Sequence, residues 1–308
     1  MRNIIIGEGH NEPAVLLHGQ KGIFPRKRVL VYPGIGDIHW VLLKLEDFAL
    51  KNKFTPEVYI WDFDGRPRSL EFLELIPFIE VGGYWHSPAN VRVATPVEPM
   101  QENVYGFDYY FCFNHALENG KDIVNDILPE YDCNFNYEII KTDREKELTE
   151  EYNKKYGKFF LTFFSNHGMF QRWVKSFCAK QGYRICKDAM HVLGAKPILT
   201  GCHWDMDFSK RVKCHDTREE LIDLVGQTDL IQFLALLRSE ACAGFVGFCG
   251  GNTIISTHFG VKTAMLWSRH FPNPGFMTDW VNPDSINKWY LPMLVEEYDR
   301  AKVLNFLR

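Results

Sequence analysis

Short apolar runs alternate with amphipathic segments along most of this chain, and this alternation limits the possible folds more than any other feature. The runs that we expect to form strands are 27–33, 57–64, 108–114, 159–165, 195–201, 243–248 and 262–267. Between them lie segments with helical spacing of apolar residues, such as 37–52 with Val41, Leu42 and Leu45. Strands that alternate with helices form parallel sheets covered by helices. The sequence therefore predicts an α/β protein.

The same alternation predicts how the chain divides into domains. It occurs in both halves, and 308 residues is long for a single core, so we expect two doubly wound parallel sheets. We place an N-terminal domain at 1–150 and a C-terminal domain at 151–308. The most polar segment, 141–158, is either a solvated helix on the rim of one domain or the connection between the two, and we favour the connection.

Local signals predict the ends of two helices in the second half. Gly is favoured just after a helix, so we expect a helix over 169–182 that ends at Gly182. Thr228 precedes a run of apolar residues at helical spacing and can cap that helix.

Composition and charge exclude several classes of protein. The net charge is −4 and no apolar run reaches about 18 residues, which disfavours nonspecific nucleic-acid binding and a transmembrane helix. The apolar stretch at the N-terminus is too short for a signal peptide, and the 8 Cys residues lack CxxC spacing. We therefore expect a cytoplasmic protein with reduced thiols and no integral membrane association. No pair in the Cys- and His-rich segment 178–215 has zinc-knuckle spacing, so no metal is assigned, although a metal site there stays an open question.

Gly250 and Gly251 stand between a strand-like run and a helix-like run. They form either a plain tight turn or a loop whose backbone approaches a phosphate. The start of a helix offers free N–H groups and the positive end of the helix dipole, and the missing side chains let phosphate oxygens come close. A branched side chain at Gly250 is then expected to fill the space of the phosphate without unfolding the protein.

Three stretches of the sequence are similar to one known family. The longest, at 223–267, reads DLVGQTDLIQFLALLRSEACAGFVGFCGGNTIISTHFGVKTAMLW and resembles the donor-binding half of GT-B glycosyltransferases, in particular the heptosyltransferase-like family 9. GAKPILTGCHWDMDF at 194–208 resembles a strand and loop of that family, and GIGDIHWVLLKL at 34–45 resembles its GxGD opening. The chain departs from the family where Cys249-Gly250-Gly251 replaces Asp-Ser-Gly and where Ile254 replaces a His.

The resemblance implies both a fold and a reaction. The fold is a pair of Rossmann-like domains that face each other across a cleft, with the last helix returning to the first domain. The reaction is the inverting, metal-independent transfer of a sugar from a nucleoside-diphosphate sugar to an acceptor hydroxyl, with no further cofactor. The departures mean that the nucleotide and the sugar are not carried over. An acceptor glycan, a lipid-linked sugar or a modified nucleic-acid base all remain open.

The resemblance and the reaction together select candidate site residues. Asp37 matches the Asp of the GxGD opening and is the expected general base, although Asp is also a good helix N-cap. His39 is the second candidate for the base. The expected donor contacts are Asn166, His167, Gly168, Arg172, His203, Trp204, Gly250, Gly251, Asn252 and Thr253. The expected acceptor contacts are Gly36, Trp85 and His86.

A purely structural role is the alternative for several of these residues. Arg172 can lie on a solvated helix face, Trp204 can belong to the core, and Thr253 can simply cap its helix. Two other functions also fit. One is an NAD(P)-dependent enzyme that uses the GIGD loop, although the third glycine of that fingerprint falls at His39 or Trp40, both too bulky. The other is a catalytically inactive sugar-nucleotide-binding protein of the same fold.

Overall fold

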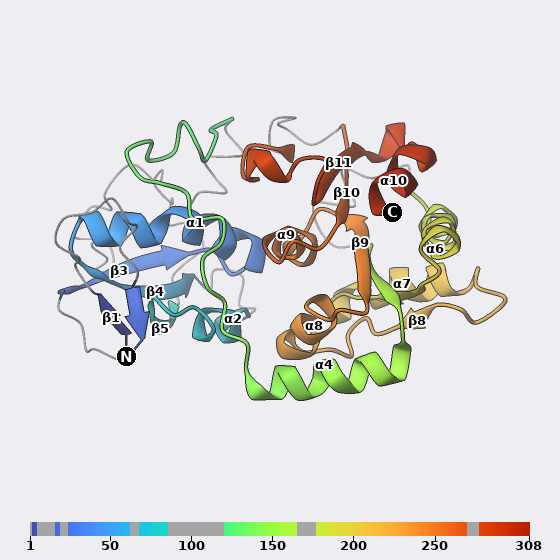
Figure 1. Ribbon diagram of the computed structural model, residues 1–308, viewed down its shortest axis with the longest axis horizontal. Coiled ribbons are helices and arrows are strands. Elements are labelled where there is room, and N and C mark those ends of the chain that lie inside the picture. Colours follow the sequence, from blue (N-terminus) through green and yellow to red (C-terminus); the bar gives the residue numbers. More distant parts are fainter. Residues whose placement is uncertain are drawn as a thin grey trace. The chain divides into compact units, whose positions relative to one another are not determined.

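The computed structural model describes residues 2–4, 16–18, 24–61, 68–85, 120–164, 177–269 and 277–308 (Figure 1). The chain forms two compact units, Met1–Ile140 and Lys141–Arg308. The second unit opens with the polar segment noted above, which forms helix α4, Asp143–Tyr156. The boundary that we expected after residue 150 falls inside this helix.

The first unit contains a parallel sheet of three strands in the order β3-β4-β5. Its elements are β1 (Arg2–Ile4), β2 (Leu16–His18), β3 (Arg26–Val31), α1 (Ile35–Lys51), β4 (Thr55–Trp61), α2 (Leu70–Glu74) and β5 (Glu80–Trp85). β1 and β2 pair separately as an antiparallel ribbon. Val58 and Ile60 of β4 and Ile38 and Leu42 of α1 are completely buried. Helix α1 contacts both β3 and β4, so these apolar side chains form the core of the unit.

Helix α1 also buries one charged side chain, that of Lys44. Its Nζ donates hydrogen bonds to the backbone oxygens of Ile127 at 2.7 Å, Leu128 at 3.0 Å and Val124 at 3.2 Å. An ammonium group has three protons to donate, and all three find acceptors here. Burial lowers the pKa of Lys44, against the smaller opposing effects of nearby acidic groups. Lys44 thereby fastens the segment around 120–130 onto α1.

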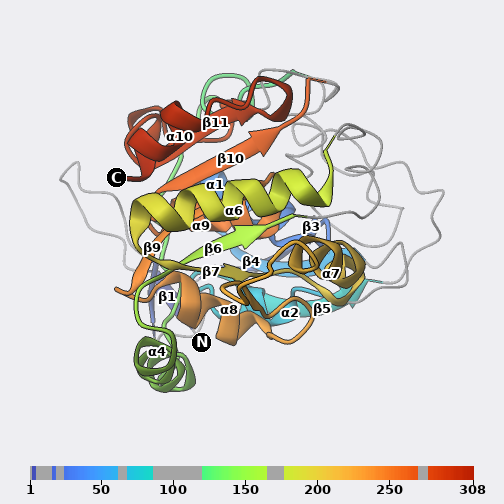
Figure 2. The same ribbon diagram turned by 90° about the vertical axis from the view of Figure 1, so that its right-hand side faces the viewer.

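The second unit contains a six-stranded parallel sheet in the order β11-β10-β9-β6-β7-β8. Besides α4, its elements are β6 (Phe159–Phe163), α6 (Ala179–Leu193), β7 (Lys196–Leu199), η1 (His203–Asp205), α7 (Met206–Lys213), β8 (Ile222–Asp223), α8 (Leu230–Leu237), β9 (Cys242–Phe248), α9 (Gly251–His258), β10 (Thr263–Trp267), η3 (Pro283–Ser285), β11 (Tyr290–Leu294), η4 (Val295–Glu297) and α10 (Arg300–Leu307). Helices α6, α7 and α10 cover one face of this sheet and α8 and α9 the other (Figures 1 and 2). The expectation of an α/β fold with two parallel sheets is confirmed, and the second sheet shows the reversal of strand order that is typical of doubly wound sheets.

The terminal helix α10 lies against α6 and β10 of the second unit. Nε of Arg300 pairs with Oδ2 of Asp188 on α6 at 3.0 Å. The return of this helix to the first domain, which the family resemblance implies, stays a prediction.

Two expected helix ends are wrong. Helix α6 runs through Gly182 and ends at Gly194, which adopts the left-handed conformation with φ 56°. Gly182 is glycine for close packing, because a Cβ there would lie 3.3 Å from Val212 and 3.4 Å from Phe164. The N-cap of α8 is Asp229, one residue beyond Thr228. It forms a capping box in which the backbone N–H groups and side chains of Asp229 and Gln232 bond reciprocally.

Helix α4 contains one fully buried carboxylate, that of Glu145. The helix packs on α8, and Nε of Arg238, just after α8, lies 3.4 Å from Oε1 of Glu145. Burial raises the pKa of Glu145 even though the Arg238 guanidinium opposes the shift. Helix α4 therefore buries one side against the rest of the second unit and exposes the other.

This buried carboxylate leads to a pH-dependent prediction for stability. A carboxyl group with a raised folded pKa binds protons more strongly in the folded state, so its contribution to stability is full below its unfolded pKa and is lost as pH rises through the folded value. We expect the free energy of unfolding of the wild type, relative to Glu145→Gln, to decrease from about pH 4 upward. Denaturant unfolding at several pH values measures this difference. Glu147→Gln, at an exposed position of the same helix, is the control. A difference that increases with pH would contradict the prediction.

Candidate functional site

The strand order of the second unit locates its ligand-binding edge. Strands β6, β7 and β8 follow one another outward in one direction, and β9, β10 and β11 in the other. The order reverses between β6 and β9, which are direct neighbours. In open α/β sheets, ligands bind outside the carboxyl ends of the strands at this switch point. The loops after β6 and β9 are therefore the candidate donor site.

The loop after β6 contains Asn166, His167, Gly168 and Arg172, which lie outside the described residues. Their roles stay predictions. The loop after β9 contains the Gly-Gly pair and is described in full. Gly250 is the N-cap of α9, and Gly251 and Asn252 are the first two residues of this helix. Both are half-buried. The strand–glycine–helix arrangement expected from the sequence is thus present at the switch point.

The Thr253 side chain forms hydrogen bonds within this loop. Its hydroxyl accepts a hydrogen bond from the backbone N–H of Gly250 at 3.0 Å and lies 2.8 Å from the backbone oxygen of Phe248, to which it donates. The side chain is completely buried. Of the two interpretations of Thr253, the structure shows the cap, and the hydroxyl has no free proton for a phosphate.

The expected effect of a branched side chain at Gly250 needs correction. The backbone φ of 179° is extended and suits any residue. A Cβ at Gly250 would lie 2.7 Å from Cε1 of Phe163, at the end of β6. Gly250→Val would therefore push against the core and would not test the space of a phosphate. Cys249 and Ile254, two residues at which the chain departs from the family pattern, are also buried, so their side chains face the interior.

The loop after β7 carries the expected nucleobase contacts. His203 is exposed, Trp204 is half-buried, and their rings meet edge to face with centroids 4.6 Å apart. Oδ2 of the buried Asp205 accepts the N–H of Cys202 at 3.0 Å and holds the loop closed. The turn after β8 supports it, because Gly226, at φ 71°, lies so close to His203 that a Cβ would be 3.1 Å from its Cα. Trp204 thus lies in the loop after β7, the strand next to β6.

In the first unit, Asp37 lies in the first turn of α1, at the carboxyl end of β3. The N-cap is Gly34, which places Asp37 at the third helical position. The alternative in which Asp37 is itself the N-cap is therefore wrong. Asp37 is half-buried, and Gly36 is buried beside it. A carboxylate at this position is favoured by the helix dipole.

His39, the second candidate for the base, is buried two residues further along α1. Its Nδ1 lies 2.7 Å from the hydroxyl of Tyr137, which is itself buried. This interaction joins α1 to the segment that precedes the second unit. The structure thus gives His39 a packing role and leaves Asp37 nearer to solvent.

Aromatic residues stand at the ends of all three strands of the first sheet. Trp61 and Trp85 are register partners on β4 and β5, and the rings of Trp61 and Tyr32, just after β3, have centroids 5.5 Å apart. Sequence reasoning selected Trp85 but missed Tyr32 and Trp61. The signal was present, because Tyr32 and Trp61 stand near the ends of the expected strands 27–33 and 57–64. His86, the other expected acceptor contact, lies outside the described residues.

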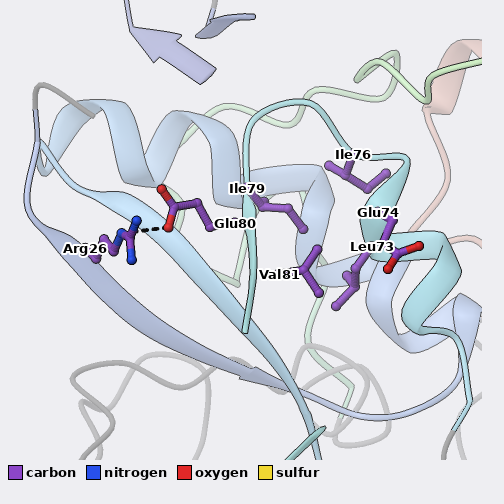
Figure 3. Close-up of a pocket in the computed structure, with 7 residues that line it drawn as sticks. All are labelled: Arg26, Leu73, Glu74, Ile76, Ile79, Glu80 and Val81. Carbon is purple, nitrogen blue, oxygen red and sulfur yellow. Dashed lines mark ion pairs between the residues drawn. The ribbon is translucent and has the colours of Figure 1, made fainter. Parts of the chain in front are cut away.

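A pocket of about 350 Å³ lies elsewhere in the first unit (Figure 3). Its lining residues are Arg26, Leu73, Glu74, Ile76, Ile79, Glu80 and Val81. Arg26 and Glu80, which form an ion pair at 2.6 Å, are the first residues of β3 and β5. The pocket is therefore at the amino ends of the strands, the edge opposite Asp37, and we do not include it in the site.

Two further properties concern only the described part of the chain. Within it, no group of three or more His, Cys, Asp or Glu side chains is arranged to hold a metal ion, and this holds for the fully described segment 178–215. None of the described helices is long and apolar enough to cross a membrane.

Among known proteins, only solved structures are similar to this chain. No protein-family model and no curated protein matches the sequence. The chain does share the fold of GT-B glycosyltransferases, as three solved structures show. They are the glycosyl transferase family 9 protein from Veillonella parvula DSM 2008 (12% identity, 94% of this chain and 92% of that one, TM-score 0.57), E. coli ADP-heptose LPS heptosyltransferase II (12%, 91% and 97%, 0.59) and E. coli heptosyltransferase WaaC with ADP (10%, 91% and 98%, 0.50). The similarity to family 9 is thus confirmed as a likeness of fold.

Proposed function

We propose that this protein is a glycosyltransferase that moves a sugar from a nucleoside-diphosphate sugar to an acceptor hydroxyl. One observation carries the proposal: the Gly-Gly loop and the start of α9 lie at the switch point of a six-stranded Rossmann-ordered sheet. This is where such sheets bind phosphorylated ligands. The GT-B fold and the carboxylate of Asp37 at a strand end support the same reaction.

In the proposed donor complex, the diphosphate lies against the N-terminus of α9. The backbone N–H groups of Gly251 and Asn252 have no partner within the helix, because they belong to its first turn. They and the helix dipole stabilise the negative charge that develops on the diphosphate as it leaves. Trp204 and His203 contact the nucleobase. Asn166, His167, Gly168 and Arg172 complete the phosphate site from the loop after β6.

In the proposed reaction, Asp37 acts as the general base. The acceptor oxygen attacks the anomeric carbon while its proton passes to the Asp37 carboxylate, and the bond from that carbon to the diphosphate oxygen breaks. A single displacement inverts the configuration at the anomeric carbon. Tyr32 and Trp85 offer aromatic faces for an acceptor glycan, with Gly36 leaving room beside the helix. The proposal needs no metal and no cofactor besides the donor.

The geometry of α1 argues against the nicotinamide alternative. The N-terminus of α1 already carries the Asp37 carboxylate, which would repel a pyrophosphate placed on the GIGD loop. His39 and Trp40, at the positions of the third glycine of the fingerprint, are both buried and are far larger than the glycine that close helix–strand packing requires there.

Thermal unfolding with a panel of nucleotides tests the proposed function. A ligand at about a hundred times its dissociation constant adds about 2.7 kcal/mol to stability. We expect at least one nucleoside diphosphate among ADP, UDP, GDP, CDP and TDP to raise the melting temperature, and we would test ADP first because it is present in the similar E. coli WaaC structure. Stabilisation by NAD(P) and by none of the diphosphates would overturn the proposal.

A further inference from the structure

We infer that Gly34 is a positioning residue for the proposed base: it is glycine so that the carboxylate of Asp37 can lie over the N-cap of α1. This inference rests on the proposed function, because it assigns Gly34 a part in the same reaction. Three properties of Gly34 support it.

The backbone at Gly34 does not require glycine. Its φ of −82° and ψ of 140° are ordinary extended values that any L-residue adopts. Elsewhere in the chain, glycines such as Gly194 and Gly226 have positive φ values, where a side chain is strained. Backbone conformation therefore explains those glycines and leaves Gly34 unexplained.

Glycine also leaves α1 without a side-chain cap. Ser, Thr, Asp and Asn are preferred at the N-cap because their side-chain oxygens accept a free backbone N–H. Three helices of the second unit follow this rule, with Thr142, Asp229 and Asp299 accepting from the third helical residue. No side-chain cap hydrogen bond is made at Gly34. The N-terminus of α1 thus lacks the side-chain cap hydrogen bond that these three helices have.

The space that a side chain at Gly34 would enter belongs to Asp37. A Cβ built on Gly34 would collide with Oδ2 of Asp37 and lie 3.3 Å from its Cγ and 3.9 Å from its Cβ. These three atoms, all from one side chain, are its nearest neighbours. Any other residue at position 34 must displace the Asp37 carboxylate. The absent side chain at Gly34 therefore sets the orientation of the proposed base.

The test uses the smallest side chain, in Gly34→Ala. Misplacement of a reacting group by about 1 Å can cost about a hundredfold in rate. We expect Gly34→Ala to lower the turnover number by tenfold or more, with the dissociation constant of the nucleotide and the melting temperature close to wild type. In the Asp37→Asn background, the same change should lower turnover no further, because Gly34 acts through that carboxylate.

Ser69→Gly is the matched control. The Ser69 hydroxyl donates to the backbone oxygen of Pro33 at 2.7 Å, next to Gly34, so its removal loosens the same loop without placing an atom near Asp37. Turnover of this variant should stay within about threefold of wild type. If Ser69→Gly loses as much turnover as Gly34→Ala, or if Gly34→Ala is still harmful in the Asp37→Asn background, the inference is wrong.

A crystal structure of Gly34→Ala gives a readout that does not depend on activity. We expect the Asp37 carboxylate to have turned away from position 34. An unmoved carboxylate in that variant would overturn the inference even if the wild type transfers sugar. A wild type that transfers sugar from no donor would overturn the proposed function, and the position of Asp37 in the variant would still decide whether Gly34 orients it.

Discussion

Asp37→Asn is expected to lower the turnover of sugar transfer by roughly 10²–10⁴-fold, the usual contribution of a positioned general base. Asn keeps the shape of the side chain but cannot take the proton of the acceptor hydroxyl. The affinity for the nucleotide should barely change, because the proposed donor contacts all belong to the second unit. Steady-state kinetics for turnover and calorimetric titration for nucleotide binding measure the two quantities separately.

If Asp37 has only a structural role, its position in α1 predicts how much stability the Asp37→Asn variant loses. At the third helical position, loss of its charge removes only a favourable interaction with the helix dipole, worth about 0.3–1 kcal/mol of stability. A slightly less stable variant with full turnover would therefore remove Asp37 from the mechanism. His39 would then be the next candidate on α1, although its ring is buried against Tyr137.

Asn252→Asp is expected to weaken nucleotide binding by roughly ten- to hundredfold. The added negative charge lies at the second position of α9, beside the proposed diphosphate, and a unit charge a few Å from a phosphate in a half-exposed site costs about 1–3 kcal/mol. The same charge is favourable for the helix itself, so the unfolding temperature without ligand should stay constant or increase slightly. Opposite signs for affinity and stability separate a phosphate site from a plain turn.

Gln232→Glu is the matched control for Asn252→Asp. It also places a new carboxylate in the first turn of a helix, α8, which begins after the outermost strand β8, and it keeps the oxygen that accepts the N–H of Asp229. Nucleotide affinity should be unchanged in this variant. Equal losses in both variants would point to overall charge, and no loss in Asn252→Asp would return the Gly-Gly loop to the role of a turn.

Local signals in the sequence located the strands at the centre of both sheets and some of the helices. Of the seven expected strands, six lie at least partly within the described residues, and each of these appears in the structure within a few positions, as do the helix expected over 37–52 and the one after Thr228. The helix expected over 169–182 is misplaced, because the described helix there, α6, runs from Ala179 to Leu193. Periodicity works because the buried face of a strand or helix repeats along the chain itself. Strands β1, β2, β5, β8 and β11 were missed. β1, β2 and β8 have only two or three residues, β5 contains Gly82 and Gly83, and β11 contains Pro292, so none of them shows such a repeat clearly.

Three glycines illustrate what local sequence patterns do not reveal. The sequence suggests a turn or a helix end at Gly182, Gly250 and Gly34 alike. In the structure the first packs inside a helix, the second accommodates the ring of Phe163, and the third leaves room for Asp37. Only the last of these neighbours is close in sequence. The sequence alone marked the candidate site at the Gly-Gly loop and at the GIGD opening.

Only the tertiary structure decided which strands are neighbours, and hence that the order reverses between β6 and β9 beside that loop. It also decided that His39 lies against Tyr137 and that Lys44 is enclosed by the backbone oxygens of residues 124–128. These pairings join segments about 80 or more residues apart. They form because burial of apolar surface brings distant segments together and strongly favours the pairing of the polar groups that are buried with it. A local sequence pattern does not show which distant segments will meet.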